Sequence, residues 1–562
     1  MGLTAEEWKM VGAEIRRQAE AANKTVDRYR IELLYWALDE RVAPPLKQKF
    51  KANHVQCRFM DRMWFYNVVL KARQHGMSLL QSILMLDKAL FTPNYRGGII
   101  DRTDAEAKKK LARIRYAYDH LDDPDDPRTA MLGAAIKEAI PLVAPSNDHT
   151  LTFANGSQIY AATSLRGGTI NYLWISELGK IALDDPHKAE EIMGGSLEAV
   201  HPGNIIVIES THEGGRFGEN YRMIRLAQKS PPVERMTKLH WMFHFFGWQD
   251  NPNYRIPLSR GQPLAATPDH QKYFAEVEKE TGKRLMEDQK HWYILKSATQ
   301  RDMARQYPAT PEEALRAQTE GAIYADIIAK LRGQGRVGDV VVNHGPLFTA
   351  WDLGMTDAVG IWLLQFAGYD IHALAFHCAN GATPAQHAAV VLQWERDFNH
   401  TIQYHLVPHD ATQLKPGGTW MQLLTEAGLR NLVRVERIPN IWIGINQTRA
   451  LLPRFRFNAR MCEKEFDMGN DRIWPSGLGA LEGYRKKLEA QQGAIREVPI
   501  HDECESGASS LRTFAEAHER GLLQGPSKPE IQSRKRLRGQ ERAITGLSQR
   551  PRKQLLSGVV MR

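Results

Sequence analysis

The chain has 562 residues, 43% of them hydrophobic and 25% charged, so it is long enough for several domains, each with its own core. No run of eighteen apolar residues occurs, and the first residues lack a basic flank and an apolar stretch, so we expect neither a membrane span nor a secretory signal. The four cysteines are scattered and form no C-x-x-C pair, which argues against a disulfide framework or a zinc knuckle. A net charge of +9 favours a polyanionic partner. We therefore expect an intracellular, multidomain protein.

The first predicted element is an amphipathic helix that begins at a capping box of Thr4 and Glu7. We assign residues 1–50 to a helical leader that packs on the following domain. In residues 51–237, short apolar strands alternate with helical stretches such as Asp104 to His120. This alternation predicts an α/β domain with a parallel sheet covered on both faces.

A candidate phosphate-binding loop follows the predicted strand Asn67 to Leu70. Its sequence is Lys71-Ala72-Arg73-Gln74-His75-Gly76-Met77-Ser78, and an apolar helical stretch comes next, which is the order of strand, turn and helix that such a loop needs. The usual G-x-x-x-x-G-K-[ST] pattern is broken, because Met77 occupies the lysine position and Lys71 the position of the first glycine. From a solvent-facing loop, Lys71 could still reach β- and γ-phosphates, while Ser78 keeps the hydroxyl for Mg²⁺. The alternative is an ordinary basic turn before a helix.

Two further predicted strands end in polar residues of the kind that surround a nucleotide. The strand Ile170 to Ile175 ends at Ser176-Glu177, where a nucleotide hydrolase has its metal-side acid and its water-activating glutamate. Ser176 stands in place of the acid, and Glu177 remains as the base. The strand Asn204 to Ile208 is followed by Glu209-Ser210-Thr211, a polar tip that can sense the γ-phosphate. Each motif alone is more often an ordinary strand end, but their order within one domain favours a nucleotide site.

Residues 238–340 are aromatic, polar and more helical than the preceding domain. We interpret this segment as a linker or lid subdomain. Its aromatic stripe is interpreted as core rather than as a base-stacking platform. The stripe consists of Trp241, Phe243, Phe245, Phe246 and Trp248.

A second α/β pattern predicts another domain over residues 341–520. Its expected strands are Leu347 to Trp351, Val359 to Phe366, Ile371 to Phe376 and Thr401 to Val407. Asp352 follows the first of these strands, and Asp410 follows the last. Acids at the ends of adjacent strands can share divalent metals that activate water against a phosphodiester, although each acid alone is more often an ordinary surface residue at a strand end. Asp357 either adds a ligand or caps the turn after Asp352.

In this order the motifs resemble those of the large terminase subunit of tailed bacteriophages, the ATP-driven motor that packages DNA into procapsids and cuts it. The resemblance implies a P-loop ATPase domain with a parallel sheet, a linker subdomain and an RNase H-like nuclease domain. The ordered set is more specific than any one of its members. The matching stretches are Asn53-His54-Val55-Gln56, Val69 to Gln74, Gly76-Met77-Ser78, Asn155-Gly156-Ser157, Arg166-Gly167-Gly168, Trp174 to Glu177, Glu209-Ser210-Thr211, Tyr307 to Ala314, Trp351 to Gly354 and Pro408-His409-Asp410.

For the first domain, the resemblance implies a site for ATP and Mg²⁺. Gln56 would lie near the adenine, Lys71 and Arg73 would bind the phosphates, and the other loop residues of this site would be Gln74, Gly76, Met77 and Ser78. Ser78 would hold Mg²⁺, and Glu177 would activate water.

The resemblance also implies roles outside the loop. Ser210 and Thr211 would couple hydrolysis to motion of the linker. Arg166 could bind a phosphate in its own subunit, act across a subunit boundary, or cap a hairpin. Residues 521–562 form a basic tail that is poor in aromatic residues, and such a run is usually a solvated, mobile end. Docking on the portal protein is a second interpretation of this tail.

The third nuclease acid departs from the family pattern. Related terminases carry Ser-His-Gly-Ala-Asp-Ala-Phe-Arg near the end of the nuclease, and its Asp completes the metal site from a helix. The aligned stretch here runs from Glu505 to Arg512 and has Ser509 in the Asp position. Two alternatives follow. In the first, Glu505 or Asp502 takes the place of the missing acid, and the site binds Mg²⁺ or Mn²⁺. In the second, the nuclease activity is weakened. We favour substitution, because acidic residues lie within one or two helical turns.

The sequence therefore predicts a large terminase subunit that drives viral double-stranded DNA into the procapsid and cuts the concatemer with a metal-dependent endonuclease. The implied partners are double-stranded DNA, the portal protein, the small terminase subunit and further copies of the chain in a ring, in the cytoplasm of the bacterial host and away from any membrane. The chief alternative is a P-loop helicase or remodeller whose RNase H-like module binds nucleic acid without cutting it. A third interpretation, a degenerate prophage scaffold, rests on the missing loop lysine and on Ser176 and Ser509.

Overall fold

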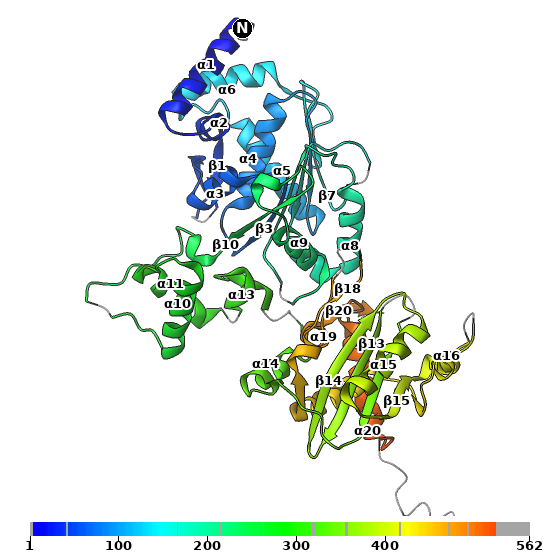
Figure 1. Ribbon diagram of the computed structural model, residues 1–562. Helices are drawn as coiled ribbons and strands as arrows, with labels where there is room; N and C mark the ends of the chain where they lie inside the picture. Colours follow the sequence, from blue (N-terminus) through cyan, green and yellow to red (C-terminus); the bar gives the residue numbers. More distant parts are fainter. Residues whose placement is uncertain are drawn as a thin grey trace, which may run out of the picture.

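Two large mixed sheets organise the chain, one in each half, with a helical lid attached to the first (Figure 1). This arrangement confirms the predicted α/β fold class. The computed structural model describes residues 4–523 except 41–42, 166, 214, 262, 301, 317–320, 355–357, 415–416, 470–472 and 492–493. Arg166, Asp357 and nearly all of the basic tail therefore lie outside the described residues.

The first sheet has eight strands, which include the predicted strands around the candidate nucleotide site. Its spatial order is β10-β3-β9-β8-β4-β7-β6-β5; all neighbours from β10 to β7 are parallel, and β6 and β5 run antiparallel at one edge. Strands β3 and β8 are buried along their whole length, as expected for parallel strands covered on both faces. The strands are β3 (Tyr66–Lys71), β4 (Arg96–Ile100), β5 (Leu142–Val143), β6 (Thr150–Phe153), β7 (Gln158–Ala162), β8 (Tyr172–Ser176), β9 (Ile205–Ser210) and β10 (Trp241–Phe246).

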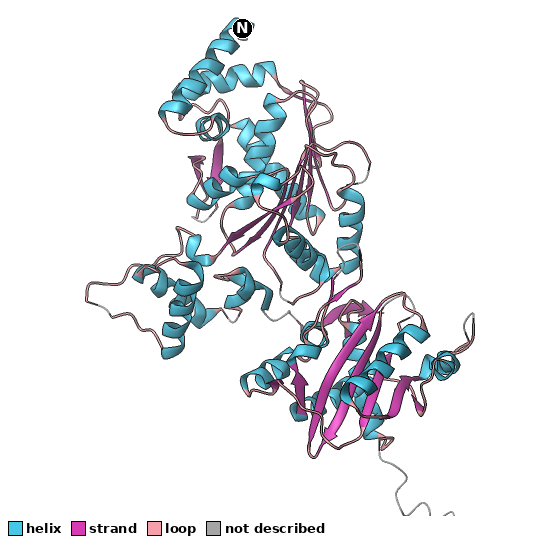
Figure 2. Ribbon diagram, in the orientation of Figure 1, coloured by secondary structure: helices cyan, strands magenta, loops and turns pink. Residues whose placement is uncertain are grey.

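Helices cover both faces of this sheet (Figure 2). One core contains Leu80 and Ile83 of α4 packed with Trp174 of β8, and the other contains Ile181 of α7 and Tyr221 of α9. The predicted capping box at Thr4 is present. The helices of this half are α1 (Ala5–Ala21), α2 (Val26–Leu34), α3 (His54–Arg62), α4 (Met77–Phe91), α5 (Asp104–Asp119), α6 (Pro127–Ala139), α7 (Leu178–Asp184), α8 (Pro186–Glu191) and α9 (Gly218–Gln228); β1 (Trp36–Asp39) and β2 (Leu46–Lys49) form a separate hairpin.

The lid consists of α10 (Pro268–Thr281), α11 (Glu287–Thr299), α12 (Met303–Gln306) and α13 (Pro311–Arg316). Its core is aromatic: the rings of Tyr254 and Trp292 stack with their centroids 4.1 Å apart, and Trp248 is fully buried beside them. The first part of the predicted linker, however, is β10, which pairs with β3 along its whole length. The ATPase-like sheet therefore continues beyond residue 237, because the aromatic stripe forms its edge strand.

The second sheet has seven strands in the order β11-β17-β14-β13-β12-β15-β16. Strands β12, β13 and β14 are antiparallel neighbours, whereas β12, β15 and β16 run parallel. The strands are β11 (Val337–Gly338), β12 (Leu347–Asp352), β13 (Val359–Ala367), β14 (Asp370–Ala379), β15 (Ile402–Pro408), β16 (Leu432–Val435) and β17 (Phe455–Asn458).

Both faces of the second sheet are buried. Helices α17 (Ile441–Leu451) and α20 (Glu505–Glu519) pack on one face, and α15 (Pro384–Phe398) and α16 (Trp420–Glu426) on the other. The smaller elements are α14 (Ala325–Gly333), α18 (Ala459–Cys462), α19 (Gly477–Gly483) and the hairpins β18 (Phe466–Asp467) with β19 (Ile473–Trp474) and β20 (Lys486–Gln491) with β21 (Ala494–Pro499).

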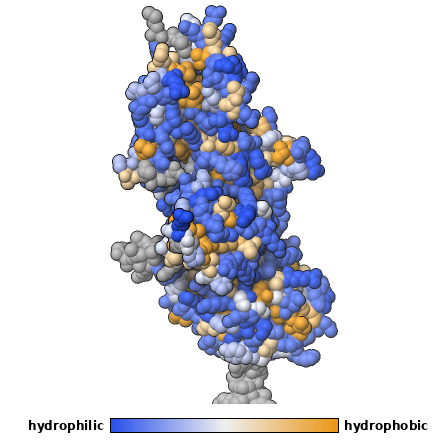
Figure 3. All heavy atoms as spheres, turned by 90° about the vertical axis from the view of Figure 1, so that its left-hand side faces the viewer, coloured by the Kyte–Doolittle hydropathy of each residue, from blue (hydrophilic) through white to orange (hydrophobic). Residues whose placement is uncertain are grey.

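The surface in Figure 3 is mostly hydrophilic, with small apolar patches scattered over it. Among the described residues, no helix is both long enough and apolar enough to cross a membrane. The large apolar side chains lie mainly in the cores on the two faces of each sheet.

Candidate functional site

Side chains from other segments hold the backbone of the loop between β3 and α4 in one conformation. Gln74 and Gly76 adopt left-handed backbone conformations, with φ of 58° and 74°, and Gly76 is the N-cap of α4. Four successive loop carbonyls accept hydrogen bonds from side chains beyond the loop. The donors are Tyr254 Oη to Arg73 O (2.6 Å), Asn251 Nδ2 to Gln74 O (3.0 Å), Asn53 Nδ2 to His75 O (3.1 Å) and Gln56 Nε2 to Gly76 O (2.8 Å). The loop thus precedes a helix N-terminus, the setting in which backbone N–H groups bind phosphate.

Lys71 is the last residue of β3, and only 7% of its side chain is exposed. Its ammonium nitrogen lies 3.3 Å from Glu209 Oε2 and 3.7 Å from Glu177 Oε1. Burial alone would lower the pKa of Lys71, but these two carboxylates outweigh it and raise that pKa, so the side chain is charged. The expectation of a lysine on a solvent-facing loop is wrong, because the side chain enters the buried edge of the sheet.

Glu209 lies in β9, between β3 and β8, and is fully buried. Its Oε1 accepts hydrogen bonds from Ser78 Oγ (2.8 Å) and Ser176 Oγ (3.3 Å). Burial would raise the pKa of Glu209, but Lys71, Lys110 and the Ser78 hydroxyl together hold it below its ordinary value. The carboxylate is therefore ionised at neutral pH.

The sequence predicts Glu209 only as part of a polar tip after a strand, and not as a ligand of a metal or of the nucleotide. It ended the strand at Ile208, whereas β9 runs to Ser210. The sequence does contain a usable signal. The carboxylate of Glu209 comes directly after an apolar strand, in a domain where Ser176 occupies the position expected for the metal-side acid.

Glu177 lies at the mouth of this arrangement. It is the N-cap of α7, with a left-handed φ of 57°, and 32% of its side chain is exposed. Its Oε2 accepts a hydrogen bond from Thr211 Oγ1 at 3.3 Å. Left-handed backbone is uncommon for a residue other than glycine and recurs at functional sites. The structure thus brings Glu177 within 3.7 Å of the Lys71 ammonium, and Glu209 contacts both Lys71 and Ser78; the roles of these residues stay predictions.

The tip of β9 connects this site to the lid. Thr211 Oγ1, which contacts the Glu177 carboxylate, also donates to Glu213 Oε1 at 3.1 Å. Glu213 Oε2 lies 3.7 Å from Arg305 Nη1 in α12 of the lid. Ser210 Oγ accepts a hydrogen bond from the backbone N–H of Gly179, in the first turn of α7 (2.8 Å). Arg305 belongs to no sequence motif that we recognised, and its role follows only from the fold.

Three predicted nucleotide ligands have other contacts. Gln56 is buried, and its Oε1 accepts from the backbone N–H of Asn53 (2.8 Å) while its amide group donates to the loop; it braces the loop, and its contact with adenine stays a prediction. The side chain of Met77 is 1% exposed and lies in the core, so only its backbone faces the loop. Arg73 is exposed, and its Nε donates to Gln306 of the lid.

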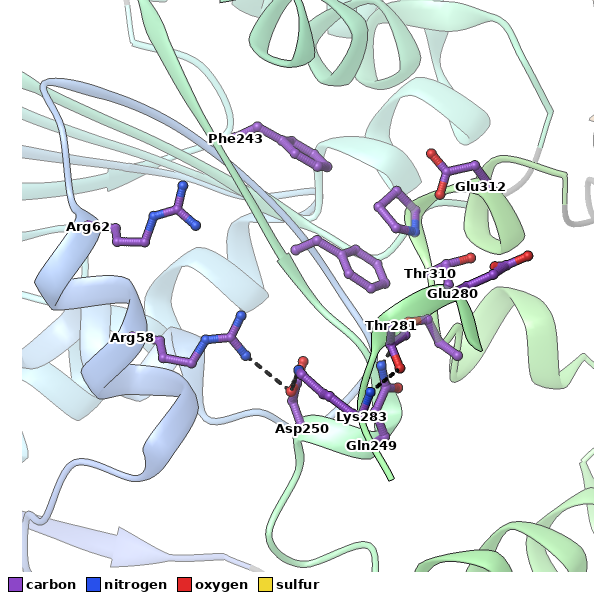
Figure 4. Close-up of a pocket in the computed structure, with 13 residues that line it drawn as sticks. Arg58, Arg62, Phe243, Gln249, Asp250, Glu280, Thr281, Lys283, Thr310 and Glu312 are labelled. Carbon is purple, nitrogen blue, oxygen red and sulfur yellow. Dashed lines mark hydrogen bonds and ion pairs between the residues drawn. The ribbon is translucent and has the colours of Figure 1, made fainter. Parts of the chain in front are cut away.

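Two cavities lie between α3 and the lid. One, of about 390 Å³, is lined by Asn251, which also braces the loop. The other, of about 670 Å³, lies against β10 and is drawn in Figure 4. Asp250 lines both cavities and forms ion pairs with Arg58 Nη1 of α3 (3.1 Å) and with Lys283 of the lid. The smaller cavity is large enough for a small ligand and adjoins the phosphate loop.

The second sheet brings the two predicted nuclease acids to one edge. Asp352 is the last residue of β12, and Asp410 lies in the short turn that follows β15, the parallel neighbour of β12. Asp410 Oδ1 is buried and has no hydrogen-bond partner within the described part of the chain. A buried carboxylate oxygen without a donor is unfavourable unless a cation is bound. The two predicted acids therefore lie at neighbouring strand ends, and their role as metal ligands stays a prediction.

Helix α20 places Ser509 over the same sheet. The packing is tight near Asp352: a Cβ at Gly360, the residue paired with Asp352 on β13, would lie 2.5 Å from the carbonyl oxygen of Ser506. Ser509 lies one turn further along the helix and is 2% exposed. Its Oγ has no hydrogen-bond partner among the described residues. The position of the missing acid is thus buried and polar, but uncharged.

Asp502 is already engaged by other groups. Its Oδ2 is ion-paired with the buried Arg485, and its Oδ1 accepts from the backbone N–H of Cys504 at 2.9 Å. Glu505 pairs with the exposed His501 at 2.5 Å and keeps 23% of its side chain exposed, so it remains as a candidate. Within the described ranges, no group of three or more His, Cys, Asp or Glu residues could hold a metal ion.

No protein-family model matches the sequence, and no curated protein matches it. Three solved structures illustrate what the fold is similar to. The large terminase of the thermophilic bacteriophage D6E is 11% identical over 83% of this chain and 99% of its own, with a TM-score of 0.27. The large terminase ATPase domain of Thermus phage P74-26 is 15% identical over 46% of this chain and 94% of its own, with a TM-score of 0.29. The large terminase nuclease of thermophilic phage G20c, solved with bound cobalt, is 13% identical over 35% of this chain and 97% of its own, with a TM-score of 0.25.

Identities and TM-scores this low carry no conclusion about activity, which must come from the geometry of the two sites. The matched proteins are a bacteriophage large terminase, a large terminase ATPase domain and a large terminase nuclease, and at these TM-scores the likeness supports no argument about this chain.

Proposed function

We propose that this chain is the large subunit of a viral terminase, an ATP-driven motor for double-stranded DNA that also carries a metal-dependent nuclease. One observation carries the ATPase half of the proposal: Lys71, Ser78, Glu177 and Glu209 meet at the edge of a parallel sheet beside a loop that starts a helix. A buried cation, a hydroxyl and two carboxylates are the groups that a nucleotide hydrolase needs.

The chain's own groups have separate tasks in this proposal. The Lys71 ammonium and the N–H groups at the start of α4 bind the phosphates. Glu177, which is exposed at the mouth, accepts the proton of the attacking water. Mg²⁺, held by Ser78, would supply charge neutralisation at the phosphate oxygens. The cavity lined by Asn251 adjoins the loop and would take the nucleoside.

The contacts of the β9 tip support a route from hydrolysis to movement. Glu177 is joined through Thr211 and Glu213 to Arg305 of the lid. A change of charge at the phosphates therefore alters the partners of a lid residue three contacts away. Ser210 and Thr211 have this coupling role in the proposal.

The nuclease half rests on Asp352 and Asp410 at one sheet edge and on the unpaired oxygen of Asp410. These residues would hold Mg²⁺ or Mn²⁺, whose charge would polarise the phosphodiester and activate water. The partners in this proposal are double-stranded DNA, a portal protein, a small terminase subunit and further copies of the chain in a ring, in the cytoplasm of the bacterial host.

The decisive experiment measures ATP hydrolysis with and without double-stranded DNA, together with DNA cutting, on one preparation of the full chain. Hydrolysis stimulated by DNA, with metal-dependent cutting and no unwinding, is expected. Unwinding without cutting would favour the helicase or remodeller, and the absence of both activities would favour a scaffold.

Lys71→Ala tests the displaced lysine in the same assay. It should abolish ATP turnover, whereas Lys109→Ala, which removes an exposed lysine of α5, should not. Because Lys71→Ala also leaves the Glu209 carboxylate buried without its cation, a melting curve must accompany the assay. Full turnover in folded Lys71→Ala would assign the phosphate role to Arg73 instead.

A further inference from the structure

We infer that Glu209 supplies the carboxylate on the metal side of the nucleotide site, in place of the acid that is missing at Ser176. This inference rests on the proposed ATPase function and adds to it the residue that completes the cation site. The acid has moved from β8 to its neighbour β9, so the chain keeps the chemistry without keeping the motif.

The sheet register shows why this exchange is possible. Glu209 and Ser176 are paired residues on the adjacent parallel strands β9 and β8. Paired residues on adjacent strands project to the same face of a sheet. Their side chains do meet, because Ser176 Oγ lies 3.3 Å from Glu209 Oε1. A carboxylate at Glu209 therefore reaches the region that an acid at residue 176 would occupy.

The second argument is the position of Ser78, the loop residue whose hydroxyl faces the cation in such sites. Ser78 Oγ donates to Glu209 Oε1 at 2.8 Å. Glu177, by contrast, contacts Lys71 and Thr211. Among the carboxylates around the loop, Glu209 is thus the one placed beside the cation-binding hydroxyl.

The donor set also fits a hard cation. Three oxygen-bearing side chains meet here, the buried Ser176 and Glu209 and the half-buried Ser78. Mg²⁺ prefers oxygen ligands and keeps several waters. Glu209 Oε2 faces Lys71 at 3.3 Å and accepts no hydrogen bond within the described residues. The ion pair with Lys71 explains how a fully buried carboxylate is tolerated without a metal.

Direct contact with the γ-phosphate is unfavourable for Glu209. A fully buried carboxylate repels a phosphate, and the cation beside it, Lys71, already pairs with it at 3.3 Å. The hydroxyls of Ser210 and Thr211, at the end of the same strand and directly after it, carry no such charge. The carboxylate and the hydroxyls of this tip therefore have different tasks.

The test is the Mg²⁺ dependence of nucleotide binding by the full chain, measured with a fluorescent ADP analogue in EDTA and over a Mg²⁺ titration. Mn²⁺ bound together with ADP, detected by electron paramagnetic resonance, gives a direct reading of the cation. Glu209→Gln keeps the shape and removes the charge. It should weaken cation binding by about 10- to 100-fold, by analogy with changes around other metal sites, and leave ADP binding in EDTA intact.

Two variants make the comparison specific. Glu219→Gln neutralises another buried carboxylate of the same domain, paired with Arg222 at 2.7 Å, and should leave Mg²⁺ dependence unchanged. Adding Ser176→Asp to Glu209→Gln returns the acid to β8 and should restore part of the Mg²⁺ dependence. A folded Glu209→Gln protein with the Mg²⁺ dependence of the wild type would overturn the inference.

Should Glu209→Gln fail to fold, Glu209→Asp decides the question. It keeps a charge for Lys71 but draws the carboxylate back by one methylene, so Mg²⁺ should bind more weakly while melting stays near that of the wild type. Unchanged Mg²⁺ affinity in Glu209→Asp would overturn the inference. If the wild type binds no nucleotide, with or without Mg²⁺, the proposed function fails and the inference falls with it. This outcome differs from unchanged Mg²⁺ binding in the Glu209 variants, which would overturn the inference alone.

Discussion

The two candidate sites occupy equivalent places, each at a strand-end edge of a mixed sheet, but they differ in how their polar groups are satisfied. At the first, Lys71, Glu209 and Glu177 balance one another, the hydroxyls of Ser78 and Ser176 are bonded, and Glu209 Oε2, which accepts no hydrogen bond within the described residues, is ion-paired with Lys71. At the second, Asp410 Oδ1 and Ser509 Oγ are buried without hydrogen bonds inside the described region.

The difference shows which missing acid a residue on a neighbouring strand can replace. An acid lost from β8 has a replacement on the adjacent strand, because paired residues on neighbouring strands share one face. For an acid absent from α20 no strand-paired replacement exists: the nearby Asp502 is held by Arg485, and Glu505, the remaining candidate, is paired with His501. We therefore expect a complete nucleotide site and an incomplete nuclease site.

The largest effect is expected for Asp502→Asn, which tests whether Asp502 is structural. The change leaves Arg485, which is 1% exposed and donates to the carbonyl of Leu183 in α7 at 3.0 Å, buried without its counter-ion. Unfolding free energy should fall by about 3–5 kcal/mol, measured by denaturant titration. Glu505→Gln, which loses only a pair with an exposed histidine, should change stability by less than about 1 kcal/mol. Normal stability combined with lost DNA cutting in Asp502→Asn would instead make it a metal ligand.

Asp410→Asn should abolish metal-dependent cutting while sparing ATP hydrolysis. Loss of a direct cation ligand is expected to reduce the cutting rate by about 10³-fold, or about 4 kcal/mol. Stability should change little, because Asp410 is only partly buried and its Oδ1 has no hydrogen-bond partner among the described residues to lose. Asp397→Asn, at an exposed acid of α15, is the matched control. Equal cutting by Asp410→Asn and the wild type would remove this edge from consideration as the nuclease site.

Glu177→Gln should reduce ATP hydrolysis by about 10²-fold and leave ATP binding intact, because the amide keeps the shape but accepts no proton. Steady-state hydrolysis and equilibrium binding of a nucleotide analogue separate the two effects. Glu198→Gln, at an exposed position of the same domain, serves as control. Parallel loss of binding and hydrolysis would show that Glu177 holds the nucleotide rather than the attacking water.

The strands and the strand-end residues of both sites could be predicted from the sequence, because apolar runs followed by Glu177, Asp352 and Asp410 are local patterns. The pairing of Glu209 with Ser176 could not, since it depends on β9 lying between β3 and β8. The burial of Lys71 likewise depends on neighbouring strands rather than on the loop's own sequence.

Two other features could not be predicted from local sequence patterns. The aromatic stripe at residues 241–248 does not indicate that β10 pairs with β3 in the first sheet. The alternation of side chains is the same for an edge strand of that sheet and for a strand within a linker. Asp502 looked like a free carboxylate because its partner, Arg485, lies on a different element.

The smallest effect is a gain. Ser509→Asp places a carboxylate at the position that the family pattern gives to the third acid, on the face of α20 that packs over Asp352. Cutting should rise by about 10-fold, because one added ligand improves cation binding by that order, and the dependence should shift from Mn²⁺ towards Mg²⁺. Ser509→Asn, which has the same shape without the charge, is the control and should leave cutting unchanged. If Ser509→Asp and Ser509→Asn behave alike while Glu505→Gln stops cutting, Glu505 is the third ligand and the second site is compensated after all, in the same way as the first.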